Sequence, residues 1–246
     1  MKLSILIPVY NEEKTIAQVL DRVRGVSLPG LLREIIAVDD HSSDRTREIL
    51  QAYAKDHAEV IPVEHPRNMG KGRAIRTALA AATGDCVLIQ DADLEYDPND
   101  YPKLLQPILE GRAKVVYGSR FLGVNRLKFV VRGFWSMLSG KRYYYLTHFL
   151  GLQFLNLLSN VLYCAKITDE ATCYKVFSRE LIAEIPLRCE RFEFCPEVTA
   201  KVRKLGVPIV EVPIRYHPRT AEEGKKLNWR DGFIAIWTLV KYRFID

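Results

Sequence analysis

The sequence lacks the cysteine pattern of a zinc protein and the leader segment of a secreted one. Its five cysteines show no pairs at zinc-site spacing, which predicts free thiols: Cys86, Cys164, Cys173, Cys189 and Cys195. Residues 1–13 begin directly with a strand-like run and not with a basic, apolar signal segment. We therefore expect a reducing, cytoplasmic location.

Two common nucleotide-binding motifs are also missing. The sequence contains no Gly-x-x-x-x-Gly-Lys-Ser/Thr loop, and no Gly-x-Gly-x-x-Gly follows the first predicted strand. ATP hydrolysis and dinucleotide redox chemistry therefore lose most of their support. The shorter Asn-Met-Gly-Lys-Gly loop at residues 68–72 could bind a phosphate through backbone N–H groups and Lys71. An ordinary helix start, with Gly70 allowing the turn, explains the same residues equally well.

Positive charge is what the sequence has in excess. The 246 residues carry a net charge of +6, with 48% hydrophobic and 27% charged residues, which is typical of a compact enzyme and not of a disordered chain. The excess favours an anionic partner, such as lipid head groups or a phosphorylated substrate. Together with the motifs described below, this excess of positive charge gives no reason to expect a nucleic-acid partner.

Up to about residue 120, short β-branched runs alternate with helical patterns. The expected strands are residues 3–9, 34–40, 60–63, 86–90 and 114–118, and the expected helices are residues 15–23, 44–57, 72–82 and 100–110. This alternation predicts an α/β fold with a mostly parallel sheet. Residues 121–246 are richer in aromatic residues and leucine, and no flexible linker precedes them. We expect one domain, 1–246, in which the second half completes a site begun by residues 1–120.

Acidic and polar clusters follow three of the predicted strands, at residues 8–12, 39–42 and 91–95. Ligands of open α/β sheets bind outside the carboxyl ends of the strands, so these clusters should meet at one site. Asp91 and Asp93 flank one small residue, which suits Mg²⁺ or Mn²⁺ shared with a diphosphate. Acidic residues also commonly end strands and cap turns. The neighbouring acidic strand ends favour metal and donor binding here.

Five segments together resemble inverting family-2 glycosyltransferases of GT-A fold. They are Pro-Val-Tyr-Asn-Glu (8–12), Val-Asp-Asp-His-Ser-Ser-Asp (38–44), Asn-Met-Gly-Lys-Gly (68–72), Asp-Ala-Asp-Leu-Glu (91–95) and Gly-Ser-Arg (118–120). Within that family the sequence is most similar to the dolichyl-phosphate mannose synthases and their bacterial polyprenyl-phosphate relatives. The match is strong over the first 120 residues and looser beyond them.

The resemblance implies a Rossmann-like sheet flanked by helices, with amphipathic helices on the acceptor side. It implies a nucleotide-sugar site formed by Pro8, Tyr10, Glu12, Asp39, Asp40, Lys71 and Asp91. It also implies Mg²⁺ or Mn²⁺ bound by Asp91, Asp93 and Glu95. Mannose synthases often carry glutamine at the position of Glu95. The extra negative charge of Glu95 departs from that pattern and could change which metal is bound and which sugar is transferred. GDP-mannose is the favoured donor, with a UDP-sugar as the alternative.

Residues 143–165 contain no Asp, Glu, Lys or Arg and could, by length, cross a bilayer as a helix of roughly 20 residues. Drawn as a helix, they place Gln153, Asn156, Ser159 and Asn160 opposite Leu150, Phe154, Leu157, Leu158 and Val161. Such a helix is better suited to lie at a membrane interface or to pack in a core. Basic and aromatic residues between 126 and 143, and again at 229–244, favour peripheral contact with the cytoplasmic face of a membrane.

Basic residues of the second half are candidates to bind the acceptor. By resemblance, the phosphate of a polyprenyl phosphate would be held by Arg120, Arg132, Arg219 and Lys226. The alternative is that these residues are solvated surface charges, the usual location of loop lysines and arginines.

The expected reaction is attack of a lipid phosphate oxygen on the anomeric carbon, with inversion and departure of a metal-bound nucleoside diphosphate. A phosphate monoester, with a second pKa of about 6, needs positioning cations more than a base. The residues that we expect to be catalytic are Asp93, Arg120 and Asp169. A saccharide hydroxyl acceptor, in polysaccharide or glycan synthesis, would need a carboxylate base such as Asp169 or Glu170. A non-catalytic, membrane-surface nucleotide-sugar-binding protein is a third possibility.

Overall fold

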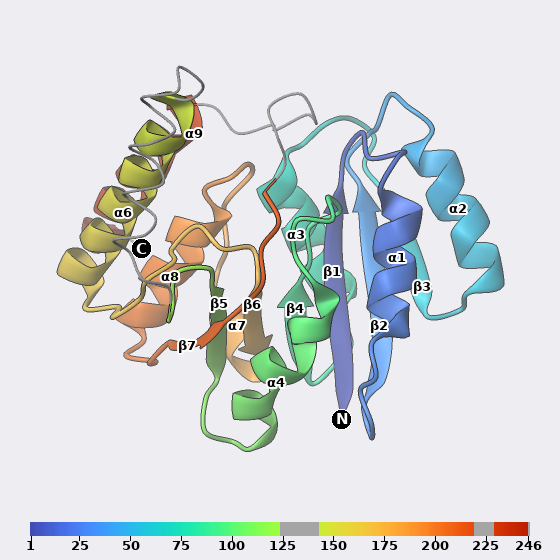
Figure 1. Ribbon diagram of the computed structural model, residues 1–246, viewed down its shortest axis with the longest axis horizontal. Helices are drawn as coiled ribbons and strands as arrows, with labels where there is room; N and C mark the ends of the chain where they lie inside the picture. Colours follow the sequence, from blue (N-terminus) through green and yellow to red (C-terminus); the bar gives the residue numbers. More distant parts are fainter. Residues whose placement is uncertain (124–142, 219–228, 246) are drawn as a thin grey trace.

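The computed structural model describes residues 1–123, 143–218 and 229–245. Its centre is a seven-stranded sheet in the order β3-β2-β1-β4-β6-β5-β7 (Figure 1). The strands are β1 (Lys2–Val9), β2 (Leu32–Asp39), β3 (Val60–Glu64), β4 (Cys86–Ile89), β5 (Val115–Ser119), β6 (Lys175–Ser178) and β7 (Val210–Pro213). Strand β6 is antiparallel to β4 and β5, and the other pairings between these strands are parallel. The expected mostly parallel α/β fold is therefore confirmed.

Helices cover the sheet and extend beyond its β7 end. They are α1 (Ile16–Gly25), α2 (Thr46–Asp56), α3 (Lys71–Ala81), α4 (Tyr101–Leu109), α6 (Tyr143–Tyr163), α7 (Arg179–Glu184), α8 (Phe194–Lys204) and α9 (Trp229–Phe244), with a short 3₁₀ turn at Pro98–Asp100. The predicted strands and helices of the first half appear within two residues of their expected ends. Elements β6, α7, α8 and β7 were not predicted from the sequence.

The core of the first half follows from apolar spacing. The inner strands β1 and β4 are almost completely buried, as expected for parallel strands covered on both faces. Helix α1 buries Ile16, Val19, Leu20 and Val23, which lie on one face at helical spacing. This packing brings the carboxyl ends of β1, β2, β4 and β5 to one edge, the upper edge in Figure 1.

Helix α3 begins where two chain segments approach closely. Gly70, which precedes it, has a φ of +90°, and a Cβ atom there would lie 2.3 Å from the carbonyl oxygen of Glu190. Only glycine fits this conformation and this contact. The loop at residues 68–71 is therefore a helix start, and it packs against residues 189–192.

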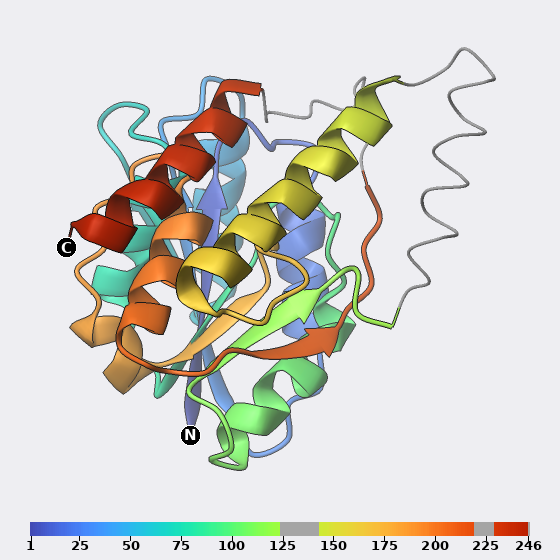
Figure 2. The same cartoon turned by 90° about the vertical axis from the view of Figure 1, so that its left-hand side faces the viewer.

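Helices α6, α8 and α9 pack against one another beside the sheet (Figures 1 and 2). They share a small apolar cluster of Tyr163, Ala200, Leu239 and Tyr242, separate from the main core. The amphipathic segment predicted at 143–165 forms α6 up to Tyr163, and the segment predicted at 229–244 forms α9. None of the described helices combines the length and the apolar character needed to cross a bilayer.

Candidate active site

A cleft of about 1510 Å³ opens at the carboxyl edge of the sheet and reaches helices α6 and α9. Pockets for one small ligand usually measure about 300–1,000 Å³, so this cleft has room for two substrates. Three loops at this edge each contain a non-glycine residue with left-handed backbone, at Asn11, His41 and Leu94, with φ values of 49°, 62° and 61°. Two further described residues of this kind, Cys164 and Lys166, follow α6. Backbone strain of about 1–3 kcal/mol per residue often occurs at functional sites, and three of the five strained residues in the described part of the chain lie at this edge.

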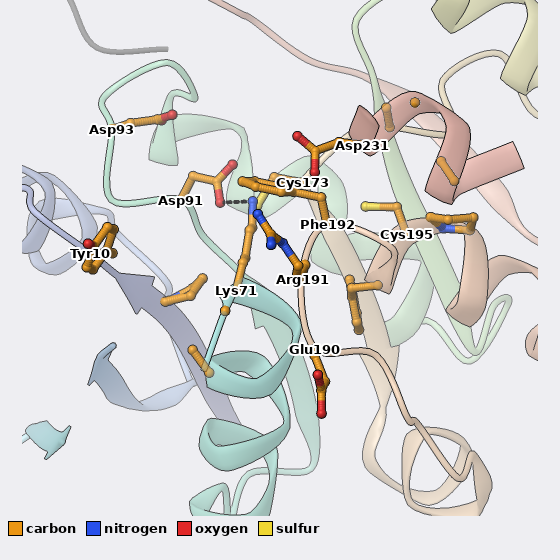
Figure 3. Close-up of a pocket in the computed structure, with 18 of the residues that line it drawn as sticks. Tyr10, Lys71, Asp91, Asp93, Cys173, Glu190, Arg191, Phe192, Cys195 and Asp231 are labelled. Atoms are coloured by element: carbon orange, nitrogen blue, oxygen red, sulfur yellow. Dashed lines mark ion pairs between the residues drawn. The ribbon is translucent and has the colours of Figure 1, made fainter. Parts of the chain in front are cut away.

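Lys71 and Asp91 form an ion pair in the cleft wall. The Lys71 ammonium lies 2.5 Å from Asp91 Oδ1, and both side chains are largely buried (Figure 3). Burial lowers the pKa of Lys71, but the charge and the hydrogen bond of Asp91 and the neighbouring cysteines together raise it more, so the side chain stays charged. The ammonium also lies 5.9 Å from the centre of the Phe192 ring. The first turn of α3 thus presents a fixed cation at the strand edge.

Asp93 and Glu95 lie in the loop after β4 and line the same cleft. The backbone N–H of Glu95 donates to Asp93 Oδ1 at 3.2 Å, and the Tyr216 hydroxyl donates to Glu95 Oε2 at 2.6 Å. Among the described residues, no three acidic, histidine or cysteine side chains converge as a complete metal site. The carboxylates of Asp91 and Asp93 nevertheless suit a hard divalent cation, and oxygens of a bound diphosphate would supply further ligands.

Three residues predicted for the nucleoside pocket line the cleft at the end of β1: Pro8, Tyr10 and Glu12. Tyr10 is 37% exposed, so part of its side chain faces the cleft. The Glu12 carboxylate accepts a hydrogen bond from the Thr15 hydroxyl at 2.7 Å, which fixes it at the start of α1. The structure therefore brings these three side chains together, as the sequence motif requires.

The two aspartates at the end of β2 have different surroundings. Asp40 lines the cleft and accepts hydrogen bonds from the backbone N–H groups of Met69 and Gly70 at 2.8 and 2.7 Å. Asp39 is only 1% exposed, accepts a hydrogen bond from Ser42 and lies outside the cleft wall. Asp40 thus shapes the loop before α3, while Asp39 organises the turn after its own strand.

Arg120 and Asp169 form a two-pronged ion pair at the end of β5. Arg120 Nε and Nη2 each donate to an oxygen of Asp169 at 2.7 Å, and the Arg120 backbone N–H donates at 3.0 Å. Burial lowers the pKa of Arg120 and the charge of Asp169 raises it, with a net rise. Arg120 lines the cleft and lies over the Tyr216 ring at 4.9 Å, whereas Asp169 is 1% exposed and does not line it.

Four charged residues of the cleft wall were not predicted: Arg67, Glu190, Arg191 and Asp231. Figure 3 shows Arg191 directed toward the Lys71–Asp91 pair, and Asp231 facing the same space from α9. The glycines at 70 and 72 indicated a close backbone approach, but no pattern indicated that residues 190–191 make it. The predicted acceptor residues Arg132, Arg219 and Lys226 lie outside the described residues.

The cleft continues along helices α6 and α9, whose outer faces are apolar. Gly151, Phe154 and Phe233 line it, and Figure 2 shows the two helices side by side. The exposed apolar side chains on them are Leu150, Phe154, Leu157 and Val161 of α6 and Phe233, Ile234, Trp237 and Phe244 of α9. Soluble monomers rarely expose so many neighbouring apolar side chains, so these faces indicate an interaction surface.

Comparisons with known proteins identify related sequences and folds. Residues 4–185 match the model described as Glycosyl transferase family 2. The chain is 29% identical over 228 residues to the dolichyl-phosphate beta-glucosyltransferase ALG5A of Trichomonas vaginalis, covering 87% of the chain and 65% of that protein, just under two thirds of its length. It is 29% identical over 253 residues to the UDP-N-acetylglucosamine–dolichyl-phosphate N-acetylglucosaminyltransferase of Methanococcus voltae, covering 96% of the chain and 94% of that protein.

Among solved structures, glucosyl-3-phosphoglycerate synthase from Mycobacterium tuberculosis in complex with Mn²⁺, UDP and glucosyl-3-phosphoglycerate has a similar fold. The TM-score is 0.70 at 22% identity, covering all of this chain and 81% of the other. Because the identity is low, the likeness concerns the fold alone, and it confirms the expected GT-A-like architecture.

Proposed function

Because the chain belongs to glycosyl transferase family 2, we propose that it transfers a hexose, with inversion, from a nucleotide sugar to a polyprenyl phosphate at a membrane surface. Both halves of the chain would form one catalytic unit, since the cleft includes residues from each. Two similar proteins carry names with a dolichyl-phosphate acceptor, which supports the lipid. Their sugars are glucose and N-acetylglucosamine, so these compete with the mannose favoured by the sequence motifs.

The donor half supplies the chemistry for departure of the nucleoside diphosphate. Asp91 and Asp93 would hold Mg²⁺ or Mn²⁺, with Glu95 beside them, and the metal would neutralise charge on the departing diphosphate. Lys71 and Arg191 face the same space and would bind the phosphates directly (Figure 3). Pro8 and Tyr10 would contact the nucleoside, with Glu12 and Asp40 fixing the loops around it.

The single observation that carries the lipid phosphate proposal is the Arg120–Asp169 ion pair. It fixes a buried guanidinium in the cleft wall, while the Asp169 carboxylate is fully engaged and turned to Arg120. A cation suits an acceptor that is itself an anion and needs alignment more than deprotonation. A hydroxyl acceptor would instead need an available base. Asp169 is held by Arg120, and Glu170, which does line the cleft, has both carboxylate oxygens engaged by the hydroxyls of Ser159 and Thr199.

The apolar faces of α6 and α9 support an acceptor that resides in a membrane. They adjoin the same cleft as Arg120, so a phosphate at Arg120 could remain attached to a chain that leaves over these faces. Lys241 and Arg243, near the end of α9, add charges that favour anionic head groups. We propose that the chain binds the membrane peripherally through this surface, and the cytoplasmic face stays a prediction from the sequence.

A donor panel tests the proposal. GDP-mannose, UDP-glucose and UDP-N-acetylglucosamine, each radiolabelled in the sugar, are incubated with polyprenyl phosphate and Mn²⁺ or Mg²⁺. We expect one donor to give an organic-extractable, mild-acid-labile product of inverted anomeric configuration. Label that enters only water-soluble or polymeric saccharide would favour a hydroxyl acceptor. Absence of both transfer and hydrolysis with every donor, despite nucleotide-sugar binding, would favour a non-catalytic binding protein.

A further inference from the structure

The segment at residues 167–170, which carries Asp169, is held by the polar face of α6. Asn160 exchanges two hydrogen bonds with the backbone of Ile167, both 2.8 Å long. Asn156 donates to the Thr168 carbonyl at 2.6 Å and accepts from the Glu170 backbone N–H at 2.7 Å. Helix α6 therefore has an apolar outer face, and its inner face contacts the segment that fixes Arg120.

Glu170 extends this contact to a second helix. Its Oε2 accepts a hydrogen bond from Ser159 of α6 at 2.6 Å, and its Oε1 accepts one from Thr199 of α8 at 2.7 Å. Its backbone carbonyl accepts a hydrogen bond from the Lys175 ammonium at 2.9 Å. Glu170 is 1% exposed and Lys175 is fully buried, and the Lys175 ammonium attracts the nearby Glu170 carboxylate from its place on the backbone carbonyl. Removing one partner would leave the other uncompensated.

The neighbouring residues complete the link to the cleft. The Glu211 carboxylate of β7 accepts hydrogen bonds from the backbone N–H groups of Thr168 and Asp169. On the other side, Asp169 holds Arg120. The three consecutive residues 168–170 are thus fixed by different elements, and Glu170 supplies the connection to both α6 and α8.

We propose that Glu170 is a positioning residue for the transfer reaction. Glu170 joins α6 and α8 to the segment that carries Asp169, and in this way it holds Arg120 in place for the acceptor phosphate. This assignment rests on the proposed function of the cleft. Glu170 acts through Asp169 and Arg120. Its loss should therefore weaken use of the acceptor and spare binding of the donor, which depends on the far side of the cleft.

Glu34 serves as a control residue. It lies near the amino end of β2, at the edge of the sheet opposite the cleft. Glu34 is 4% exposed and accepts hydrogen bonds from the hydroxyls of Ser4 and Thr83 at 2.6 and 2.8 Å. Its carboxylate also pairs with the Lys2 ammonium at 2.5 Å. Glu34, like Glu170, is a buried glutamate that accepts hydrogen bonds from two hydroxyls. It differs in that Lys2 contacts its carboxylate directly and in that it does not line the cleft, which Glu170 does.

The experiment compares the full-length wild-type protein with Glu170→Ala, Glu170→Gln and Glu34→Ala. Acceptor KM and kcat are measured with polyprenyl phosphate and the active donor, and donor affinity is measured by calorimetry. We expect Glu170→Ala to raise the acceptor KM about 10- to 100-fold, while donor affinity stays within about twofold. Glutamine can contact both hydroxyls, so Glu170→Gln should restore most of the loss. Glu34→Ala should lower the melting temperature without changing the acceptor KM.

A second variant covers the case in which Glu170→Ala does not fold. Glu170→Ala with Lys175→Met removes both buried charges, and it should show the same selective rise in acceptor KM. An unchanged acceptor KM in a folded Glu170 variant, or a parallel loss of donor affinity, would overturn the assignment. If wild-type protein forms no lipid-linked sugar with any donor, the proposed function and this assignment fail together. If it does, only the assignment is at stake.

Discussion

Helices α1 and α6 are both amphipathic, yet they use their two faces in opposite ways. Helix α1 buries Ile16 and Val19 against the sheet and turns its charged residues to solvent. Helix α6 buries Asn156 and Ser159, which are 6% and 0% exposed, and exposes Leu157 at 59%. Asn156, Ser159 and Asn160 of this polar face are stable inside the protein because they form hydrogen bonds with residues 167–170. An amphipathic pattern therefore does not by itself tell which face the protein covers.

The reversal separates two tasks within one molecule. The sheet edge of the first half gathers carboxylates and cations around the space that we propose for a nucleotide sugar. Helices α6 and α9 present an apolar surface that the described residues leave uncovered. If the comparison is correct, substitutions in the first region should abolish chemistry and leave membrane binding intact, and substitutions in the second should do the reverse.

The largest effect should come from the metal side of the sheet edge. Asp91→Asn should lower kcat about 100- to 1000-fold, because a cation that stabilises the departing diphosphate loses a charged ligand. Chelator added to the wild-type protein should act similarly. Steady-state transfer measures both, and binding to vesicles should be unchanged. Asp21→Asn, on α1 and away from the cleft, is the control. Normal turnover by Asp91→Asn in excess chelator would refute the metal-dependent mechanism.

Arg120 should give the next largest effect. Arg120→Ala should lower kcat/KM for polyprenyl phosphate about 100-fold, since the acceptor anion loses its positioning cation. Asp169→Asn should retain more activity, because asparagine keeps one hydrogen-bond acceptor for Arg120 and no base is needed. Kinetics at varied acceptor and saturating donor provide the measurement. Complete inactivity of Asp169→Asn with normal donor binding would point to a general base and a hydroxyl acceptor.

The apolar surface can be tested one side chain at a time. Trp237→Ser should weaken binding to vesicles that contain phosphatidylglycerol about tenfold, as expected for loss of one buried large apolar side chain. Trp237 is 65% exposed, so the folded protein should keep its melting temperature. Sedimentation with vesicles measures the change. Leu32→Ser is a matched control because Leu32 is 73% exposed at the start of β2, on the opposite edge. Equal losses for both variants would argue against a specific membrane face.

The sequence predicted the family and the first half of the fold because each element there carries its own local signal. Strand β1 is a continuous apolar run, and the acidic residues of the site follow their strands directly, so topology alone brings Asp91 and Tyr10 to one edge. The motif resemblance then supplied the family, which the comparison over residues 4–185 confirms. Local pattern and tertiary structure agree in this half.

The second half could be predicted only in part, because its structure depends on contacts between distant segments. Strand β6 is four residues long and antiparallel, and it pairs between two strands that precede it in the chain. Arg191 enters the cleft because residues 189–192 pack on Gly70, a contact no local pattern specifies. Asp169 was a plausible base by position, but its ion pair with Arg120 appears only when β5 and the segment before β6 meet.

Glu34 and Glu170 give the smallest predicted effect and the sharpest contrast between the two regions. Burial would raise the pKa of Glu34, but hydrogen bonds from Lys2 and Ser4 lower it to about 2. Burial raises the pKa of Glu170 to about 7, against the attraction of Lys175. The difference arises because Lys2 donates to the carboxylate of Glu34, whereas Lys175 donates to the backbone carbonyl of Glu170.

Opposite pKa shifts predict opposite dependences of stability on pH. An unfolded glutamate titrates near pH 4.5, so the stability due to Glu34 is complete above that pH and is lost as the pH falls toward 2. The folded protein retains the proton of Glu170 longer than the unfolded chain does, so this contribution declines as the pH rises from 4.5 to about 7. The nearby charges are Lys175 and Asp169, while the neighbouring Tyr117, Tyr163 and Cys195 stay neutral because burial raises their pKa values.

Urea unfolding of wild-type, Glu34→Gln and Glu170→Gln proteins between pH 3 and 8 measures both contributions. In Glu34→Gln, the unfolding free energy should fall less steeply as the pH drops below 4.5. In Glu170→Gln, it should fall less steeply as the pH rises from 4.5 to 7. The two slopes should be separable because each variant leaves the other carboxyl intact and the two lie at opposite edges of the sheet. If Glu170→Gln changes the unfolding free energy only below pH 4.5, the Glu170 carboxyl is ionised above that pH, and the attraction of Lys175 outweighs the effect of burial.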